Sequence, residues 1–367
     1  MPLLSLSDLP FVRSKDAIAV DIGTYSIKIL HIKKHGDSYH LVKWGTVPLA
    51  DINRDISPAE RKNAILSRLA EYLAVEKIAV KNIVTSVSGN QVIVRHVQLQ
   101  KMSREELEKN IAMEAEPYIP FGITEVDLSF YILPGDVDSQ KMDAIIVAAK
   151  KEVVSAKIEM LNTLNLRPVV VDIDAFAISN AYELNSDKTL NETVLIADIG
   201  ASATNISIIA NHVSKVVRDV YVAGNTFTKA VMKAASCDQK TAEDLKANNI
   251  IIVTPEDKDK ISSDNQKLQV STALTQTAKE LLTEIQKSID FYISQRAENT
   301  VNKILISGGS ANIKNLDKYL SQQLKAAVEI FNPLRAIIEG EKVPQEFATE
   351  FAVSVGLGMR YENDVKK

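Results

Sequence analysis

Two short segments of this chain place an aspartate and a glycine at the end of an apolar run, just before small and hydroxyl-bearing residues. The first is AVDIGTYSIKIL, which contains Asp21 and Gly23, and the second is IADIGASATNISII, which contains Asp198 and Gly200. A glycine after a strand lets backbone amides approach phosphate oxygens, because no side chain stands between them. Two such hairpins facing each other would clamp a polyphosphate.

The polar side chains of both segments suit a polyphosphate and its metal ion. Lys28 would place a positive charge on the anion. Asp21 and Asp198 would repel phosphate directly, but they can hold the hydration shell of a Mg²⁺ ion that bridges the phosphates. Further donors would come from the hydroxyl groups of Thr24, Ser26, Ser202 and Thr204.

A third glycine-containing segment follows much later in the chain. In ILISGGSANI, residues 304–313, an apolar strand delivers Gly308 and Gly309 to the start of a helix, with Ser310 next. Backbone without side chains can lie flat against a nucleobase or ribose. Each segment alone also fits an ordinary turn, so their recurrence is what favours nucleotide binding. The chain lacks both G-x-G-x-x-G and the Walker lysine motif, which disfavours a dinucleotide fold and a P-loop.

The elements that must carry these segments alternate between strands and helices. Ser57-Pro58 with Glu60, and Ser103 with Glu106, supply capping boxes for two helices, and a later apolar stripe predicts a long helix. The expected strands are 17–23, 25–33, 39–47, 91–99, 126–133, 142–149, 168–172, 194–198 and 303–307, with a hairpin over 204–222 and a turn at 134–136. The expected helices begin at 57 and 103 or cover 151–164, 174–183, 225–235, 241–246, 270–295 and 351–360.

Composition limits the class of protein. A chain of 367 residues exceeds the usual span of one hydrophobic core, which favours two or more packed subdomains. The net charge of -4, with Lys and Glu interspersed, offers no basic surface to nucleic acid. The single cysteine, Cys237, cannot close an intramolecular disulfide, and the five histidines have no metal-ligand or triad spacing. No apolar run suits a bilayer span, and residues 1–16 lack the pattern of a signal peptide.

In this order and spacing, the three segments resemble the two phosphate loops and the adenosine loop of the actin, hexokinase and heat-shock chaperone superfamily, over nearly the whole chain. The resemblance implies an α/β fold of two lobes, each a twisted mixed sheet with helices, with ATP and Mg²⁺ between them. It assigns Lys28 to the β- and γ-phosphates, and the Glu-x-x-Lys pair Glu243 and Lys246 to the ribose and adenine. Relatives carry two glycines before the second-lobe helix, whereas this chain has Ala223 and Gly224. The implied nucleotide contacts are Asp21, Gly23, Thr24, Tyr25, Ser26, Lys28, Asp198, Gly200, Ala201, Ser202, Thr204, Gly224, Glu243, Lys246, Gly308, Gly309 and Ser310.

Two further segments resemble the PilM family of type IV pilus assembly proteins, in the FtsA-like branch of the superfamily. They are EAEPYIPF, residues 114–121, and EIQKSIDFY, residues 284–292. That resemblance implies a small α+β insertion in the first lobe, the 1C subdomain. The implied domains are a first lobe (1A) over 15–89 and 165–190 with 350–367 returning to it, the 1C insertion over 90–164, a second lobe (2A) over 191–235 and 265–349, and a small nucleotide-covering subdomain (2B) over 236–264.

A member of this family is expected to be a cytoplasmic ATP-binding scaffold, peripheral at the inner membrane, that serves pilus assembly and twitching motility. The resemblance implies that it binds the N-terminal tail of PilN in a nucleotide-responsive way, with weak or no ATPase activity, while self-association stays open. The proline-stiffened apolar run Tyr118, Ile119, Pro120 and Phe121, together with Arg95, is the expected groove for that tail. Burial of the run inside the subdomain is the competing interpretation.

Three other functions stay open. An FtsA-type division protein should end in a basic amphipathic helix, whereas this chain ends RYENDVKK. The L protein of type II secretion normally continues into a membrane-spanning helix. A small-molecule phosphotransferase of the same superfamily would need a carboxylate base near the cleft floor, for which Asp172 and Asp174 are available, with Asp174 as the catalytic candidate.

Overall fold

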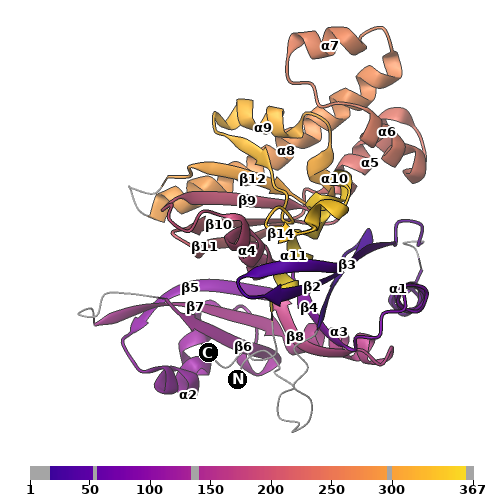
Figure 1. Ribbon diagram of the computed structural model, residues 1–367. Helices are drawn as coiled ribbons and strands as arrows, with labels where there is room; N and C mark the ends of the chain where they lie inside the picture. The colour runs from indigo at the N-terminus through magenta and orange to yellow at the C-terminus, as the bar shows by residue number, and fades with distance from the viewer. Residues whose placement is uncertain (1–16, 53–55, 134–139, 296–299, 361–367) are drawn as a thin grey trace. The chain divides into compact units, whose positions relative to one another are not determined.

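The computed structural model describes residues 17–52, 56–133, 140–295 and 300–360 (Figure 1). The expected turn at 134–136 and the two ends of the chain, 1–16 and 361–367, lie outside the described residues. The chain divides into two compact units. Unit 1 comprises residues 1–34, 42–177 and 356–367, and unit 2 comprises residues 35–41 and 178–355. The finer division into four subdomains stays a prediction.

The main sheet of unit 1 has the strand order β3-β2-β1-β4-β8. Strands β1 and β2 are antiparallel, whereas β1, β4 and β8 run parallel. Because the carboxyl ends of parallel strands meet at one edge of a sheet, Asp21, Ser86 and Asp174 come to the same edge. The elements are β1 Ile18–Ile22, β2 Ser26–His35, β3 Ser38–Pro48, α1 Pro58–Val75, β4 Asn82–Val87, α3 Lys151–Asn162 and β8 Arg167–Ile173.

Helix α1 begins as the sequence predicts, and it also holds the first hairpin. The backbone N–H of Ser57 donates to Glu60 Oε2 over 2.9 Å, and the backbone N–H of Glu60 donates to Ser57 Oγ over 3.3 Å, which completes the capping box. One turn later, Arg61 Nη2 donates to the carbonyl oxygen of Thr24 over 3.2 Å. The start of α1 is therefore tied to the turn that follows β1.

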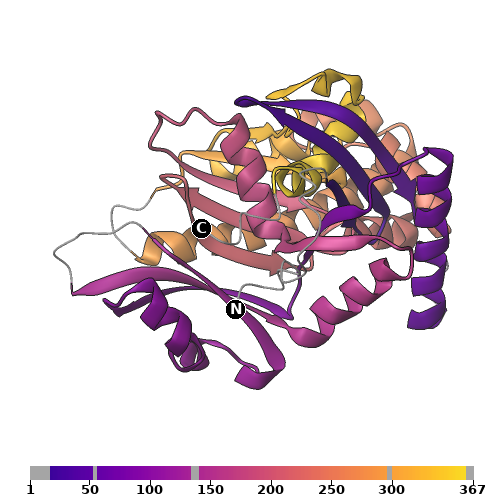
Figure 2. The same cartoon turned by 60° about the horizontal axis from the view of Figure 1, so that its bottom comes forward.

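A second, three-stranded sheet of unit 1 has the order β5-β7-β6 and is antiparallel throughout (Figure 2). Helix α2 packs on one face of it and starts with the predicted capping box of Ser103 and Glu106. Leu107 and Ile111 of the helix meet Ile146 of the central strand in a core of their own. The elements are β5 Val92–Gln100, α2 Arg104–Ala115, η1 Glu116–Tyr118, η2 Ile123–Glu125, β6 Val126–Ile132 and β7 Lys141–Lys150.

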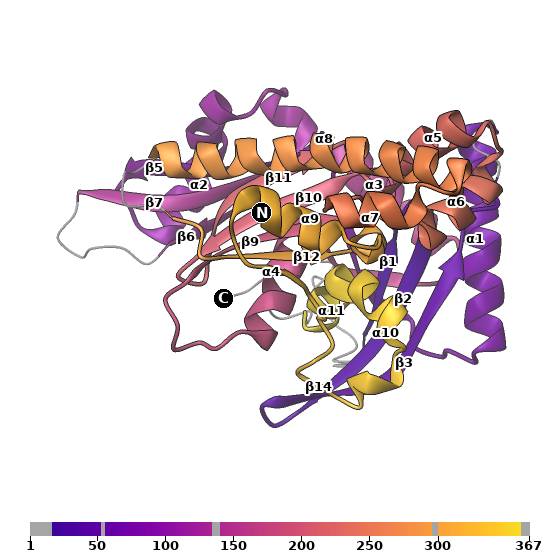
Figure 3. The same ribbon diagram turned by 90° about the horizontal axis from the view of Figure 1, so that it is seen from above.

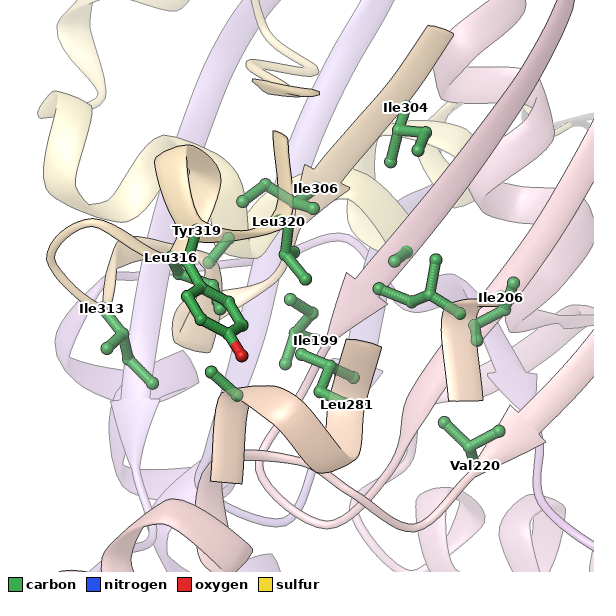
Figure 4. Close-up of a cluster of buried hydrophobic side chains, with 14 of the residues drawn as sticks. Ile199, Ile206, Val220, Leu281, Ile304, Ile306, Ile313, Leu316, Tyr319 and Leu320 are labelled. Carbon is green, nitrogen blue, oxygen red and sulfur yellow. The ribbon is translucent and has the colours of Figure 1, made fainter. Parts of the chain in front are cut away.

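Unit 2 is built on a five-stranded sheet in the order β11-β10-β9-β12-β13. Strands β9, β10 and β11 form an antiparallel meander, and β9, β12 and β13 run parallel. The long helix α8 lies across one face of this sheet (Figure 3), and Leu281 of α8 packs with Ile206, Ile304 and Ile306 in a single apolar core (Figure 4). The strands are β9 Thr193–Ile199, β10 Thr204–Ala210, β11 Val213–Val220, β12 Lys303–Ser307, β13 Val328–Ile330 and the short β14 Ile337–Ile338, which pairs with residues 39 and 40.

The helices of unit 2 differ from the expected ones at several places, and helices α7 and α9 are both additional to the expected ones. Helix α7 was not expected, because it carries few apolar residues and so has no periodic signal, although Thr254 and Asp257 give it a capping box. Helix α8 begins at Asn265 rather than at 270, with Asp264 accepting the backbone N–H of Lys267 over 3.0 Å. The helices are α4 Asp174–Asn185, which starts in unit 1, α5 Gly224–Ala235, α6 Gln239–Asn248, α7 Pro255–Ile261, α8 Asn265–Gln295, η3 Gly309–Asn312, α9 Leu316–Leu324, η4 Gly340–Lys342, α10 Gln345–Ala348, η5 Thr349–Phe351 and α11 Ala352–Gly358, which ends in unit 1.

Candidate functional site

The two Asp-x-Gly segments fold into turns with the same bond. In hairpin turn 1, residues 23–26, the N–H of Gly23 donates to the carbonyl of Ser26 over 3.1 Å. In hairpin turn 2, residues 200–203, the N–H of Gly200 donates to the carbonyl of Ala203 over 3.0 Å. A Cβ added at either glycine would lie 3.0 or 2.9 Å from that carbonyl oxygen, which is too close for comfortable contact. The sequence repeat is therefore also a repeat of backbone structure.

The two hairpins differ in the residue that faces the aspartate across the strands. In unit 1, Asp21 is paired with Lys28, and Lys28 Nζ lies 3.8 Å from Asp21 Oδ2. In unit 2, Asp198 is paired with Asn205. The side chains of Lys28 and Asp21 are 16% and 14% exposed, so the ion pair is shielded but still reachable. The hairpin of β1 and β2 thus carries the positively charged side chain, Lys28, as the sequence predicts.

A second carboxylate lies near Asp21 in unit 1. Asp174, the first residue of α4, is half-buried and bonded to the hydroxyl groups of Ser86 and Ser88 at the end of β4. Burial raises the pKa of Asp174 to about 6, and the charge of Asp21 adds to that rise. Lys157 of α3 opposes it, while burial lowers the pKa of Lys157 itself. Two carboxylates and a lysine from three elements therefore share one region.

The other candidate base, Asp172, has a different environment. Asp172 is buried in β8, its Oδ1 accepts the backbone N–H of Ile173 over 2.9 Å, and its Oδ2 lies 3.1 Å from Arg360 Nε. This ion pair ties β8 to the end of α11 within unit 1. The two candidates for a base thus have different partners, which are Arg360 for Asp172 and the hydroxyl groups of Ser86 and Ser88 for Asp174.

In unit 2 the start of helix α5 packs directly on hairpin turn 2. The N–H of Gly224 donates to the carbonyl of Gly200 over 3.0 Å, and the N–H of Asn225 donates to the carbonyl of Ala201 over 2.7 Å. Ser310 Oγ donates to the same Gly200 carbonyl over 3.1 Å. A Cβ at Gly224 would lie 2.5 Å from Ser310 Oγ, so the approach requires glycine. The structure brings the second and third glycine segments together.

The backbone at Gly308 has the strictest requirement for glycine. Its φ is 82°, a left-handed value that side chains disfavour, and an added Cβ would lie 2.5 Å from the carbonyl oxygen of Ile199. Gly309 is exposed, and Ser310 is buried. The segment after β12 is therefore pressed against the end of β9, next to hairpin turn 2.

The alanine that replaces the first of the two glycines before α5 has a backbone conformation that alanine readily adopts. Ala223 has φ -153° and ψ -171°, an extended backbone that any residue adopts, and its side chain is buried. Its N–H donates to Thr226 Oγ1 over 3.2 Å, which caps the helix. Alanine is therefore compatible with the geometry of this loop.

The Glu-x-x-Lys pair of α6 is formed, and it includes a residue that the sequence did not indicate. Lys246 Nζ lies 2.6 Å from Glu243 Oε2, with both side chains largely shielded. Thr228 of α5 is buried, and its hydroxyl contacts both charged groups. Nothing in the local sequence marks Thr228, because its contacts come from a separate helix.

Two predicted phosphate donors are engaged or buried inside the fold. The hydroxyl of Thr204, which is completely buried, donates to the carbonyl of Val222 over 2.7 Å, so its proton is engaged inside the fold. Ser26 is also buried, and within the described part of the chain its hydroxyl makes no hydrogen bond. Ser202 is exposed and accepts from Asn225 Nδ2 over 3.0 Å, and Tyr25 is 39% exposed.

The expected partner residues divide between surface and interior. Arg95 and Pro120 are exposed, and Tyr118 is 39% exposed. Ile119 is buried, and Phe121 packs against the core of the three-stranded sheet, with Lys150 Nζ 4.8 Å from its ring centroid. Burial inside the subdomain therefore applies to Ile119 and Phe121, and the groove stays a prediction for the exposed residues.

The donor set suits a polyphosphate and a hydrated cation more than a directly bound metal. Among the described residues, no group of three or more His, Cys, Asp or Glu side chains could hold a metal ion by itself. In unit 2, the backbone at Gly200, Gly224 and Gly308 leaves no space for a Cβ, so these turns keep bare backbone amides. In unit 1, Lys28 supplies a positive charge. Bare amides and a lysine are the kinds of group that bind the phosphates of a nucleotide.

Comparisons with known proteins identify the family of this chain. The family model of type IV pilus assembly protein PilM matches residues 19–362. The solved structure of a PilM-PilN type IV pilus biogenesis complex is similar with a TM-score of 0.79 and 25% identity, covering 95% of this chain and 99% of that one.

Two more distant structures are similar in fold. The ethanolamine utilization protein EutJ from Carboxydothermus hydrogenoformans has a TM-score of 0.52 and 14% identity, with 95% and 90% of the two chains covered. MreB 5 of Spiroplasma citri bound to AMPPNP has a TM-score of 0.52 and 16% identity, with 91% and 97% covered. Together with the PilM-PilN complex, they confirm the expected mixed α/β fold. Within the described residues, no helix has the length and apolar character that crossing a membrane requires.

Proposed function

Because this chain belongs to the PilM family of type IV pilus assembly proteins, we propose that it is an ATP-binding scaffold of the pilus assembly platform. The observation that carries the nucleotide part is the pair of hairpin turns closed by the same glycine bond, one beside Lys28 and the other beneath the start of α5. A scaffold needs an affinity for its partner that changes with the bound nucleotide, and it does not need rapid hydrolysis.

Both units carry residues that the proposal assigns to a nucleotide, and each unit is considered by itself. In unit 1, Lys28 would bind phosphate and Asp21 would orient water molecules around Mg²⁺; in unit 2, Asp198 has the same proposed role as Asp21. The magnesium ion, when bound, neutralises charge on the phosphates. In unit 2, hairpin turn 2 and the start of α5 accept the phosphate chain, and Glu243 and Lys246 bind the ribose and adenine.

Turnover of ATP is weak or absent in this proposal. Asp174 is the carboxylate best placed to orient a water molecule, because it lies near Asp21. Burial disfavours the charged form of Asp174, whereas the hydrogen bonds from Ser86 and Ser88 stabilise it. These two hydroxyl groups also fix the position of the carboxylate. We keep Asp174 as the catalytic candidate for any slow hydrolysis.

The protein partner that we propose is the N-terminal cytoplasmic tail of a PilN homologue. The support is the similar solved structure, which is a PilM-PilN complex. The surface that we assign to the tail contains Arg95, Tyr118 and Pro120, with Phe121 supporting it from the core. Such a partner would hold the chain at the inner membrane.

The nucleotide part is tested by replacing Lys28 with methionine, which keeps the apolar stem and removes the ammonium group. Titration of a fluorescent ATP analogue with Mg²⁺ should show affinity reduced by about 1.5 to 3 kcal/mol, the range for a charge-assisted hydrogen bond. Lys81→Met, at an exposed lysine of the same unit, is the matched control and should bind like the wild type. Equal affinity of the Lys28→Met and Lys81→Met proteins would place the phosphates elsewhere.

The partner part is tested with a synthetic PilN-type N-terminal peptide. Its affinity should differ between the ATP-bound protein and the nucleotide-free protein, and Arg95→Ala should weaken it. Arg95 Nη1 donates to the carbonyl of Val94 in its own strand, so its loss should leave the sheet intact. A peptide that binds equally with and without nucleotide would refute the nucleotide-responsive part alone.

A further inference from the structure

One buried hydroxyl joins helices α5 and α6 of unit 2. Thr228 Oγ1 lies 2.7 Å from Glu243 Oε1, 2.9 Å from Lys246 Nζ and 2.9 Å from the carbonyl oxygen of Gly224. Thr228 is 3% exposed, so water competes poorly for these contacts. A residue on one helix therefore contacts both members of an ion pair on the next.

The number of protons decides how these contacts are made. A hydroxyl has one proton and two lone pairs, and a lysine ammonium can only donate. Lys246 must therefore donate to Thr228, whose single proton goes to the Glu243 carboxylate or to the Gly224 carbonyl. Bonds to charged groups are the stronger ones, which favours the shorter contact with Glu243. Thr228 is thus a connecting point in a charged network.

The same network continues to hairpin turn 2. Thr228 lies one helical turn after Gly224, whose N–H donates to the carbonyl of Gly200. A short series of bonds therefore runs from the turn at Gly200 through α5 to the Glu243–Lys246 pair. The ends of this series are the groups proposed above for the phosphates and for the nucleoside.

We infer that Thr228 is a positioning residue, which holds the Glu243–Lys246 pair in the orientation that recognises the nucleoside, at a fixed place relative to hairpin turn 2. This inference rests on the proposed ATP-binding function. Without the hydroxyl, Glu243 and Lys246 would keep their mutual ion pair but lose its connection to α5. Nucleoside recognition would then weaken while phosphate recognition persists.

The test is Thr228→Val, which removes the hydroxyl and nearly preserves the shape of the side chain. Calorimetric titration should show the affinity for Mg-ATP reduced about tenfold or more, as expected for a lost hydrogen bond to a charged group. The affinity for magnesium tripolyphosphate, which has no nucleoside, should stay unchanged. Thr228→Ser restores the hydroxyl and should restore ATP affinity.

The matched control is Thr277→Val in α8. Thr277 is equally buried, and its hydroxyl donates to the carbonyl of Ala273 four residues earlier, as the hydroxyl of Thr228 can do to Gly224. Its loss should leave ATP affinity unchanged. If Thr228→Val does not fold, Thr228→Ala provides the same comparison of ATP with tripolyphosphate.

The outcomes separate the inference from the function on which it rests. Wild-type affinity for ATP in a hydroxyl-free variant at 228, or equal losses for ATP and tripolyphosphate, would overturn the positioning role. A wild-type protein that binds neither compound would overturn the proposed ATP-binding function instead. A loss confined to ATP, with rescue by Thr228→Ser, supports the inference.

Discussion

Replacing Asp174 with asparagine should stabilise the nucleotide-free protein at alkaline pH. The pKa of Asp174 is raised from 3.8 to about 6, chiefly by burial and then by the charge of Asp21. Because the pKa is higher in the folded state, the contribution of this group to the free energy of unfolding is greatest below the unfolded pKa. That contribution is lost as the pH rises through the folded pKa. The carboxylate therefore destabilises the folded protein above about pH 6.

The size of the effect follows from the two pKa values. At 1.36 kcal/mol per pH unit, the interval from 3.8 to about 6 corresponds to about 3 kcal/mol. Asp174→Asn has no charge to bury, so it should gain up to about 3 kcal/mol at pH 8 and almost nothing at pH 4. The change should develop between about pH 4 and pH 6.

The assay is urea unfolding followed by the fluorescence of Trp44, the only tryptophan in the sequence. Trp44 lies in β3, in the same unit as Asp174, so its signal reports on the unit that carries the change. Glu71→Gln, at an exposed carboxylate of α1, is the control and should show no comparable pH-dependent gain. A gain that is the same at pH 4 and pH 8, or a loss at pH 8, would refute the proposed cause.

Two further stability predictions come from backbone and packing. Gly308→Ala should cost about 3 kcal/mol or more in thermal unfolding, because it combines a φ of 82° with a clash, whereas the exposed Gly309→Ala, whose Cβ meets only the flexible end of Glu350, should cost less than about 1. Phe121→Ala should lower stability by about 2 to 3 kcal/mol and Tyr118→Ala by less than about 1, since only the former packs in a core. Equal melting temperatures within either pair would contradict the corresponding argument.

The parts of the fold that the sequence predicted are those with local signals. The capping boxes at Ser57 and Ser103 and the Asp-x-Gly hairpins depend on residues a few positions apart, so sequence spacing contains the necessary information. The match of Lys28 to Asp21 is of the same kind, because the two residues belong to one hairpin.

The residues that were missed receive their roles from long-range packing. Lys157 lies on α3 and Ser86 at the end of β4, and each meets Asp174 because parallel strands bring separate elements to one edge. Serines at the end of the apolar run over residues 83–88 were the available signal for Ser86 and Ser88. Lys157 had none, since a helix that precedes a strand does not indicate which of its lysines reaches that edge.

Burial also separated residues that sequence composition treated alike. Thr204 and Ser202 are both small and hydroxyl-bearing, yet Thr204 is completely buried and Ser202 is exposed. Ser202 lies in hairpin turn 2, whereas Thr204 is the first residue of β10, whose residues are all buried. Whether a residue lies in the turn or in the strand therefore decides which hydroxyl is reachable, and a count of hydroxyl groups near a glycine does not give that boundary.

The two hairpins have the same turn but differ in charge at one position. The octapeptides DIGTYSIK and DIGASATN occupy corresponding positions, with the same closing bond, and the only difference in charge between them is Lys28 against Asn205. The first copy is therefore neutral and the second carries one negative charge. Placing the second octapeptide at the first position would keep the backbone turn, but it would replace the lysine with asparagine and leave a net negative charge there. The two segments therefore share a backbone turn but differ in their attraction for an anion, and Lys28 alone accounts for the difference in charge.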